Sequence, residues 1–203
     1  MIDKPCLLVG ITGASGIRYA LRLLELCDLL TKHYRKVDVV YTKYAKNIAE
    51  LEEGVDLGKS LHQYRCVDQV FKWNEMHASI ASSSNLFAYE GVIVPATLNT
   101  IAKLATGIQD NLLLRAFSSL IRLKRKVVVV VRETPLSQTD LLNLYKLSKL
   151  GAIILPASPG FYGNPASISD LIDFVVGKIL DALGVEHNLY RRWTGKSETY
   201  RKP

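Results

Sequence analysis

The chain has 203 residues, 48% of them hydrophobic and 22% charged, with a formal net charge of +7. This length and balance indicate one globular domain, 1–203, and argue against a disordered chain. The positive charge is compatible with a nucleic-acid function, but no aromatic–basic motif of an RNA-binding module is present, and we expect no nucleic-acid partner.

Strands and helices are predicted to alternate along the chain. Short apolar, mostly β-branched runs predict strands at Cys6–Ile11, Val37–Thr42, Gly91–Thr97, 126–133 and Gly151–Ala157. Amphipathic helices are predicted after the first glycine turn through Leu30, after Thr42 to about Glu52, and at Thr100–Thr106, Asn111–Lys124, Ser137–Leu150 and Ser167–Leu183. Buried strands joined by helical crossovers indicate an α/β fold with a parallel sheet covered on both faces. A basic tail follows from about residue 186.

Polar residues gather where the predicted strands end. Small hydroxyl side chains follow the first, second and third strands, and Arg132 and Glu133 end the valine run. Ligands of parallel α/β sheets bind beyond the carboxyl ends of the strands. Folding alone does not require this pattern, so we expect a ligand site at this edge.

The first strand leads into GITGASG, Gly10–Gly16, ahead of a helix. Glycines allow a phosphate to approach the backbone, and helix N-termini attract anions. The spacing is G-x-x-G-x-x-G, and the second strand ends at Thr42 without the acidic residue of a dinucleotide site. A mononucleotide is therefore favoured. The alternative is a plain tight turn with Ser15 as the helix cap.

Two further polar segments leave alternatives open. PATLNT, residues 95–100, offers the hydroxyls of Thr97 and Thr100, either to a cofactor or as helix caps. ASIASSS, residues 78–84, is either a flexible loop or a phosphate-binding loop. Between Asn111 and Arg132 lie six basic and no acidic residues, which suit a phosphorylated ligand, although 124–126 fit a solvated helix face equally well.

The three cysteines, Cys6, Cys27 and Cys66, are widely spaced and odd in number. We expect reduced thiols, with neither a disulfide nor a zinc site. The four histidines show no metal-ligand spacing. No apolar run has the length of a membrane span, and the glycine-broken start is a poor signal peptide, so a cytoplasmic protein is expected.

Five segments, taken in chain order, resemble the UbiX-type flavin prenyltransferases: VGITGASG, PATLNT, RAFSSLIRLKRKVVVVVRETPL, PASPGFYGNP and RRWTG. The resemblance runs from about Leu7 to Gly195. It implies a Rossmann-like, three-layer α/β/α flavoprotein that forms a homo-oligomer built from trimers, usually a dodecamer. It also implies transfer of a dimethylallyl group from dimethylallyl monophosphate to reduced FMN, without a metal. A UbiD-type decarboxylase would receive the prenylated FMN.

The resemblance also implies roles for individual residues. The expected FMN-binding residues are Gly13, Ala14, Ser15, Thr42, Thr97, Thr100, Arg115 and Trp193. The expected prenyl-phosphate residues are Ser83, Ser84, Arg122, Arg132, Tyr162 and Lys178. Glu133 and Glu52 match the family's catalytic carboxylates, and Ser15 is expected to act with them. Several cations suit a phosphate leaving group, and Glu133 beside Arg132 is placed for proton transfer.

Three positions depart from the family pattern. Most members have lysine at Arg122, arginine at Lys178 and glycine at Ser84. Arginine and lysine are not interchangeable, because arginine cannot release a proton and lysine lacks the planar fork. Phosphate binding is still expected, but the length of the prenyl donor and the number of its phosphates are open.

Two other functions remain as alternatives. An FMN-dependent cysteine-type decarboxylase shares the PATLNT-like segment, but the helix after Thr42 has no histidine and GFYGNP has no cysteine. A non-catalytic flavin carrier would not need Arg132, Glu133 and Tyr162 together.

Overall fold

The computed structural model describes residues 4–195. A six-stranded sheet with the order β3-β2-β1-β4-β5-β6 lies at its centre, and all neighbouring strands are parallel. The strands are β1 (Cys6–Ile11), β2 (Val37–Tyr41), β3 (Val67–Lys72), β4 (Tyr89–Ala96), β5 (Val127–Val131) and β6 (Ile153–Pro156). The chain order reverses between β1 and β4, so this is the switch point at which such sheets bind ligands.

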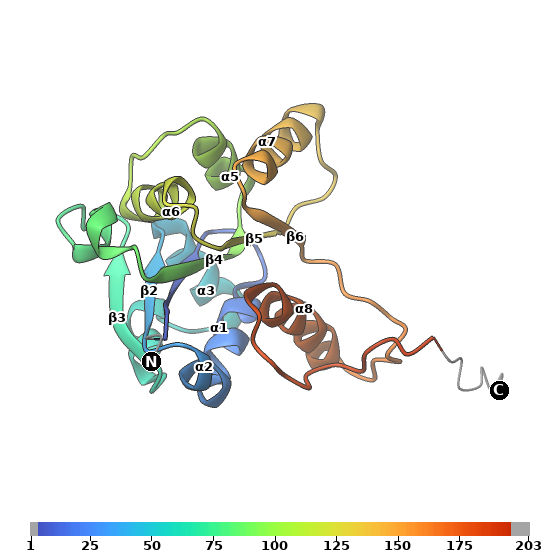
Figure 1. Cartoon of the computed structure of the whole chain (residues 1–203). Helices are drawn as coiled ribbons and strands as arrows, with labels where there is room; N and C mark the ends of the chain where they lie inside the picture. Colours follow the sequence, from blue (N-terminus) through green and yellow to red (C-terminus); the bar gives the residue numbers. More distant parts are fainter. Residues whose placement is uncertain (1–3, 196–203) are drawn as a thin grey trace, which may run out of the picture.

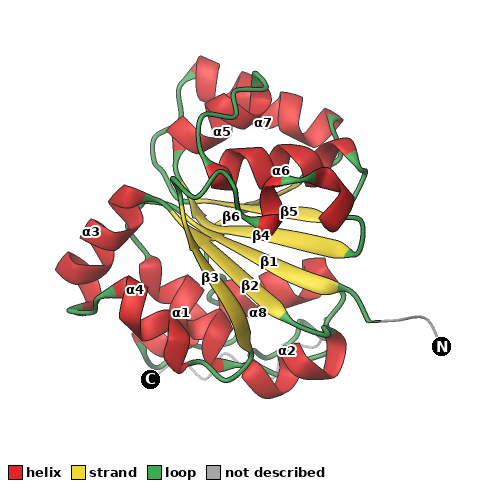
Figure 2. Cartoon of the chain, turned by 90° about the vertical axis from the view of Figure 1, so that its left-hand side faces the viewer, coloured by secondary structure: helices red, strands yellow, loops and turns green. Residues whose placement is uncertain are grey.

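Helices cover both faces of the sheet and complete three layers (Figures 1 and 2). One face carries α1 (Ile17–Glu25), α2 (Cys27–His33), α3 (Lys43–Glu53), α4 (Leu57–Ser60) and α8 (Ile168–Leu183). The other carries α5 (Leu98–Ala105), α6 (Leu112–Arg122) and α7 (Gln138–Lys149). Three short 3-10 turns complete the elements: η1 (Leu61–Gln63), η2 (Ser79–Ala81) and η3 (Ser83–Asn85). No helix within 4–195 is long and apolar enough to cross a bilayer.

The five valines of β5 show why the central strands are apolar throughout. All five are buried. Val128 and Val130 pack into the core beneath α1 and α8, whereas Val127, Val129 and Val131 pack into the core beneath α5, α6 and α7. Successive side chains of a strand point to opposite faces, so a strand covered on both sides needs an apolar residue at every position.

The predicted α/β/α architecture and its five strands are confirmed, with the helix predictions correct to within a few residues. The sixth strand, β3, was not predicted. It lies at the edge of the sheet, and most of its side chains are partly or fully exposed, so VDQVFK lacks an apolar run. The first predicted helix is divided into α1 and α2, because Leu26 leaves the helical conformation.

The prediction of three reduced thiols is wrong for two of them. Cys27, at the start of α2, and Cys66, just before β3, form a disulfide with a Cα–Cα distance of 5.1 Å. Both lie in the core beneath α1, where folding brings together positions 39 residues apart. Cys6 is the free cysteine among the described residues, and it is buried.

Candidate active site

The carboxyl ends of five strands form a continuous edge held by backbone hydrogen bonds. The amide of Thr42 donates to Ile11 O at 3.0 Å, and that of Thr12 donates to Pro95 O at 3.3 Å. The next contacts along this edge join Arg132 N to Ala96 O at 3.5 Å and Ala157 N to Val131 O at 2.9 Å. Residues from five segments distant in sequence are therefore placed side by side, as the sequence pattern predicted.

Thr12 joins the two central strand ends through its side chain. Its buried hydroxyl donates to Pro95 O at 2.7 Å and accepts from the amide of Thr97 at 2.9 Å. This residue was not assigned a site role from the sequence. The only signal was its place directly after the first strand, and its contacts give it the role of fixing the loop after β4 against the loop after β1.

The glycine turn after β1 is closely packed and strained for any residue but glycine. Gly16 has φ +94° and caps α1 without a side-chain hydrogen bond, so the alternative of Ser15 as the cap is not what the structure shows. A Cβ at Gly13 would lie 2.4 Å from the Cβ of Tyr44 in α3. Ser15 itself is exposed at this turn. The turn therefore presents backbone and the Ser15 hydroxyl instead of bulky side chains.

Glu52 reaches the same turn from the far end of α3. Its Oε2 accepts hydrogen bonds from the amides of Gly16 at 2.8 Å and Ile17 at 3.4 Å. A carboxylate in this position interacts favourably with the free amides at the start of α1. Glu52 and the glycine turn are thus brought together although they are 36 residues apart.

Arg132 lies next to the glycine turn. A Cβ at Gly16 would be 3.9 Å from Arg132 Cγ, and the charge of Arg132 acts on the nearby Tyr19. Arg132 Nε is buried and has no acceptor among residues 4–195. A buried N–H of a charged group without an acceptor is costly, so this position favours binding of an anion. Glu133 follows it, is exposed, and accepts from the amide of Thr134.

Two of the three threonines assigned to the flavin, Thr42 and Thr97, act as helix caps in this structure. Thr42 accepts from Ala45 N at 3.2 Å and begins α3, while Thr97 accepts from Thr100 N at 3.2 Å and begins α5. The hydroxyls of Thr97 and Thr100 are 2.9 Å apart. Capping uses one lone pair of each cap hydroxyl, so it leaves acceptor capacity for a second contact.

Arg115 connects α6 to the serine-rich segment. Its Nε donates to Ala81 O at 3.1 Å and its Nη1 donates to Gln109 Oε1 at 2.9 Å. Ser83 and Ser84 follow in η3, where the Ser84 hydroxyl lies 2.9 Å from that of Ser82. The segment is therefore organised by short-range turns and by Arg115 instead of being an extended flexible loop.

Within a single chain, Arg122 and Arg132 lie at opposite ends of β5. It ends α6 just before β5 begins, and its Nη2 donates to Ser119 Oγ at 3.0 Å. Arg132 follows the other end of β5. Five residues of parallel strand extend roughly 17 Å. Arg122 and Arg132, which are both expected to bind the prenyl phosphate, therefore lie far apart within one chain.

Tyr162, Lys178 and Trp193 form a second group over α8. The Tyr162 ring is 5.8 Å, centroid to centroid, from both Trp193 and Phe174. Lys178 Nζ lies 5.4 Å from the ring centre of Phe174 and 4.8 Å from that of Tyr190. The group gathers three of the predicted residues, and among the described residues no hydrogen bond, ion pair or ring contact joins it to Arg132.

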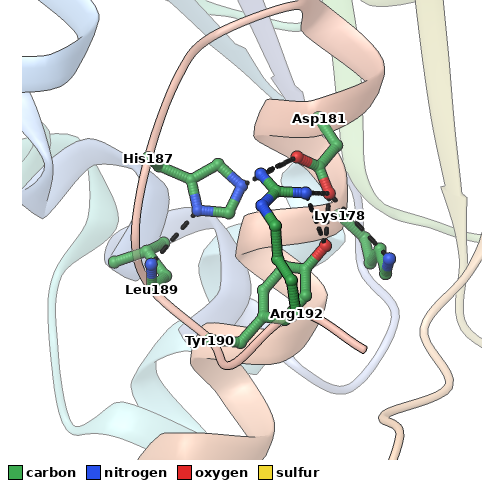
Figure 3. Close-up of polar contacts among 6 residues, drawn as sticks. All are labelled: Lys178, Asp181, His187, Leu189, Tyr190 and Arg192. Atoms are coloured by element: carbon green, nitrogen blue, oxygen red, sulfur yellow. Dashed lines mark hydrogen bonds and ion pairs between the residues drawn. The ribbon is translucent and has the colours of Figure 1, made fainter. Parts of the chain in front are cut away.

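Charged side chains lie beside this group on α8 and in the segment that follows it, as Figure 3 shows for Lys178, Asp181 and Arg192. The pKa of Lys178 is raised, chiefly by its interaction with the Tyr190 hydroxyl, so the ammonium stays protonated at neutral pH. Both regions therefore offer cations and hydroxyls, which suit phosphate groups. Within the described part of the chain, no three His, Cys, Asp or Glu side chains gather as a metal-binding group.

The strand order, the glycine turn after β1 and the threonine-bearing strand ends define a Rossmann-like nucleotide-binding fold.

The profile of the family described as Flavoprotein matches residues 1–180. A flavin prenyltransferase UbiX of Alkalihalophilus pseudofirmus is 44% identical over 192 residues, covering 91% of this chain and 94% of that protein. The UbiX of Saccharolobus solfataricus is 38% identical, covering 93% and 92%.

A solved structure agrees with the sequence relatives. The crystal structure of AnUbiX (PadA1), in complex with FMN and dimethylallyl pyrophosphate, has a TM-score of 0.87 at 30% identity and covers 96% of this chain and 100% of that one. The chain therefore belongs to the flavoprotein family and, within it, to the UbiX flavin prenyltransferases.

Proposed function

We propose that the protein transfers a dimethylallyl group from dimethylallyl monophosphate to reduced FMN. The observation that carries this proposal is the juxtaposition of the glycine turn, Glu52 and the unpartnered Nε of Arg132 at the switch point of the sheet. The relatives are named flavin prenyltransferases, and the solved relative AnUbiX was crystallised with FMN and a dimethylallyl phosphate ester.

The strand-end residues fit FMN. We assign its contacts to Gly13, Ala14, Ser15, Thr42, Thr97, Thr100 and Arg115, with Trp193 beside the ring. Gly13 packs against Tyr44 where no side chain would fit, and Ser15 of the same turn is exposed. The capping threonines retain acceptor capacity, and they follow β2 and β4, the two strands on either side of β1. FMN, when bound in its reduced form, supplies the electron-rich ring that accepts the prenyl group.

The cations serve the leaving group. As the C–O bond of the prenyl phosphate breaks, negative charge grows on the departing phosphate, and positively charged donors stabilise it. We assign this role to Arg132, with Arg122, Lys178, Tyr162, Ser83 and Ser84 as further phosphate contacts. The Arg132 Nε–H needs an acceptor, which a phosphate oxygen supplies.

The carboxylates handle protons. Formation of a bond to the flavin requires loss of a proton from the ring, and Glu133 follows Arg132 directly, so we assign it as the base. We place Glu52 and Ser15 with it, because the Glu52 carboxylate already lies on the amides after Ser15. Glu133 is exposed in the single chain and free to orient toward a bound ring.

The test is an anaerobic mixture of purified protein, reduced FMN and dimethylallyl monophosphate, followed by the mass of the extracted flavin. A gain of one five-carbon prenyl unit is expected. Unmodified FMN with both the monophosphate and the diphosphate would overturn the proposal and favour a decarboxylase or a flavin carrier. Comparing the activity with the two donors also shows whether the unusual residues Arg122, Lys178 and Ser84 change the preferred prenyl donor.

We further propose that the active form is a homo-oligomer built from trimers and that a UbiD-type decarboxylase receives the product. A dodecameric UbiX-like protein of Escherichia coli O157:H7 has a TM-score of 0.86 at 32% identity, covering 94% of this chain and 100% of that one. The separation of Arg122 from Arg132 within one chain also favours assembly. Light scattering tests the oligomer, and activation of a purified apo-decarboxylase tests the recipient.

A further inference from the structure

Asp181, on the outer side of α8, receives hydrogen bonds from three residues of the following segment (Figure 3). Its Oδ2 accepts from the Tyr190 hydroxyl, and its Oδ1 accepts from Arg192 Nη2 at 2.7 Å. His187 Nε2 lies 3.1 Å from the same Oδ1, and His187 Nδ1 accepts from the amide of Leu189. One carboxylate therefore fixes a stretch that spans residues 187–192.

The segment lies directly against α8. A Cβ at Gly177 would be 2.5 Å from Tyr190 Cδ1 and 2.8 Å from His187 Cε1, so only glycine allows this approach. The Tyr190 ring packs 4.9 Å from that of Phe174. The close contact therefore depends on Gly177 and Phe174 of α8, against which the segment packs tightly.

Lys178, one turn before Asp181, remains available to a ligand. Its Nζ is 3.9 Å from Asp181 Oδ2, farther than His187 at 3.1 Å and Arg192 at 2.7 Å are from Oδ1, so the carboxylate is already shared with closer donors. The ammonium instead rests over the faces of Phe174 and Tyr190, and the Lys178 side chain is 43% exposed. A cation held over aromatic faces keeps its charge, and the exposed part of the Lys178 side chain lets that charge meet an incoming anion.

We propose that Asp181 is a positioning residue for prenyl transfer. It holds the Tyr190 hydroxyl and Arg192; Tyr190 in turn supports Lys178, and the fixed segment carries Trp193 to the Tyr162 ring. This inference rests on the proposed function, in which Lys178 and Tyr162 contact the prenyl phosphate.

The electrostatics of the group agree with this role. Partial burial acts to raise the pKa of Asp181, but the hydrogen bonds from Arg192 and Tyr190 outweigh it and lower the pKa to about 2. Asp181 is therefore ionised throughout the neutral range, and the charge that holds the segment is present whenever the enzyme works.

The test compares Asp181→Asn with Asp173→Asn. Asp173 lies on the same helix, two turns earlier, and binds Arg22 of α1 at 2.6 Å instead of the tail segment. Asp181→Asn is expected to raise the KM for dimethylallyl monophosphate about tenfold, with kcat changed less than threefold. Asp173→Asn is expected to leave that KM unchanged. Tyr190→Phe, which removes only one hydroxyl, should shift the KM in the same direction as Asp181→Asn.

A second readout does not depend on activity. In a Trp73→Phe background, Trp193 is the remaining tryptophan, and Asp181→Asn is expected to change its emission while Asp173→Asn does not. Equal KM values for both variants in an active enzyme would overturn the inference alone. A wild-type protein that prenylates no flavin would overturn the proposed function and this inference with it.

Discussion

The strand-end site and the group over α8 are built in different ways. At the strand ends, backbone hydrogen bonds between neighbouring segments place Thr12, Thr42, Thr97 and Arg132 side by side. Over α8, side chains converge on one carboxylate, Asp181, and no strand register fixes them. The first arrangement depends on the fold as a whole, and the second depends on a few ionised and aromatic groups.

This difference predicts how each region responds to change. Removing one side chain at the strand ends should leave its neighbours in place, because the backbone holds them. Removing one side chain over α8 should move several others, because they hold one another.

The largest effect is expected at Glu133. Glu133→Gln should reduce prenyl transfer by ~10²–10⁴-fold, the usual contribution of a general base, while FMN binding is retained. Steady-state turnover and flavin titration measure the two quantities. Glu50→Gln, which removes an exposed carboxylate from α3, is the matched control. Wild-type turnover by Glu133→Gln would remove Glu133 from the mechanism.

Arg132→Ala should have the next largest effect. Loss of a charged donor to the phosphate is expected to raise the KM for the prenyl donor by ~10–100-fold, with little change in FMN affinity. Titrations of both ligands under anaerobic conditions separate the two. An equal loss of both affinities would place Arg132 at the flavin instead.

Gly13→Ala tests the close packing of the strand-end site. The added Cβ would lie 2.4 Å from Tyr44 Cβ, so the free energy of unfolding should fall by about 1–3 kcal/mol. Gly163→Ala is the control from the other region, because its Cβ would meet only Arg191 Cβ at 3.9 Å. Denaturant unfolding measures both, and equal stabilities would contradict the packing argument.

The smallest effect is a pH dependence of the α8 group. The pKa of Asp181 is lowered from 3.8 to about 2, so its contribution is complete above pH ~4 and is lost as the pH falls toward 2. Trp193 emission in the Trp73→Phe background should therefore change within this window. The Asp181→Asn variant should show no such transition, and a transition of the same size in that variant would assign it to another group.

The sequence predicted the parts of the molecule that depend on local pattern. The continuous apolar runs of β1, β4 and β5 identified buried strands, and parallel strands then required the polar residues after Ile11, Ala96 and Val131 to share one edge. The edge strand β3 was missed because its side chains are partly or fully exposed, so its sequence does not need an apolar run.

Contacts between side chains that are distant in the sequence were harder to predict. The resemblance assigned Glu52 to the site, but its hydrogen bonds to the α1 amides depend on the packing of α3. Arg122 and Arg132 lie close in sequence, yet a strand separates them in space. The role of Asp181 could not be predicted, because nothing in the spacing of Lys178, His187 and Tyr190 shows that they meet. The tail beyond Gly195 lies outside the described residues.

The disulfide between Cys27 and Cys66 encloses α2, β2, α3, α4 and η1 in one covalent ring. Thr42 and Glu52 both lie inside it. A single proteolytic cut anywhere between the two cysteines would therefore leave the fragments attached, and they would migrate separately only after reduction. In oxidising conditions the part of the chain that carries Thr42 and Glu52 is closed at both ends, so it can be cut without being released.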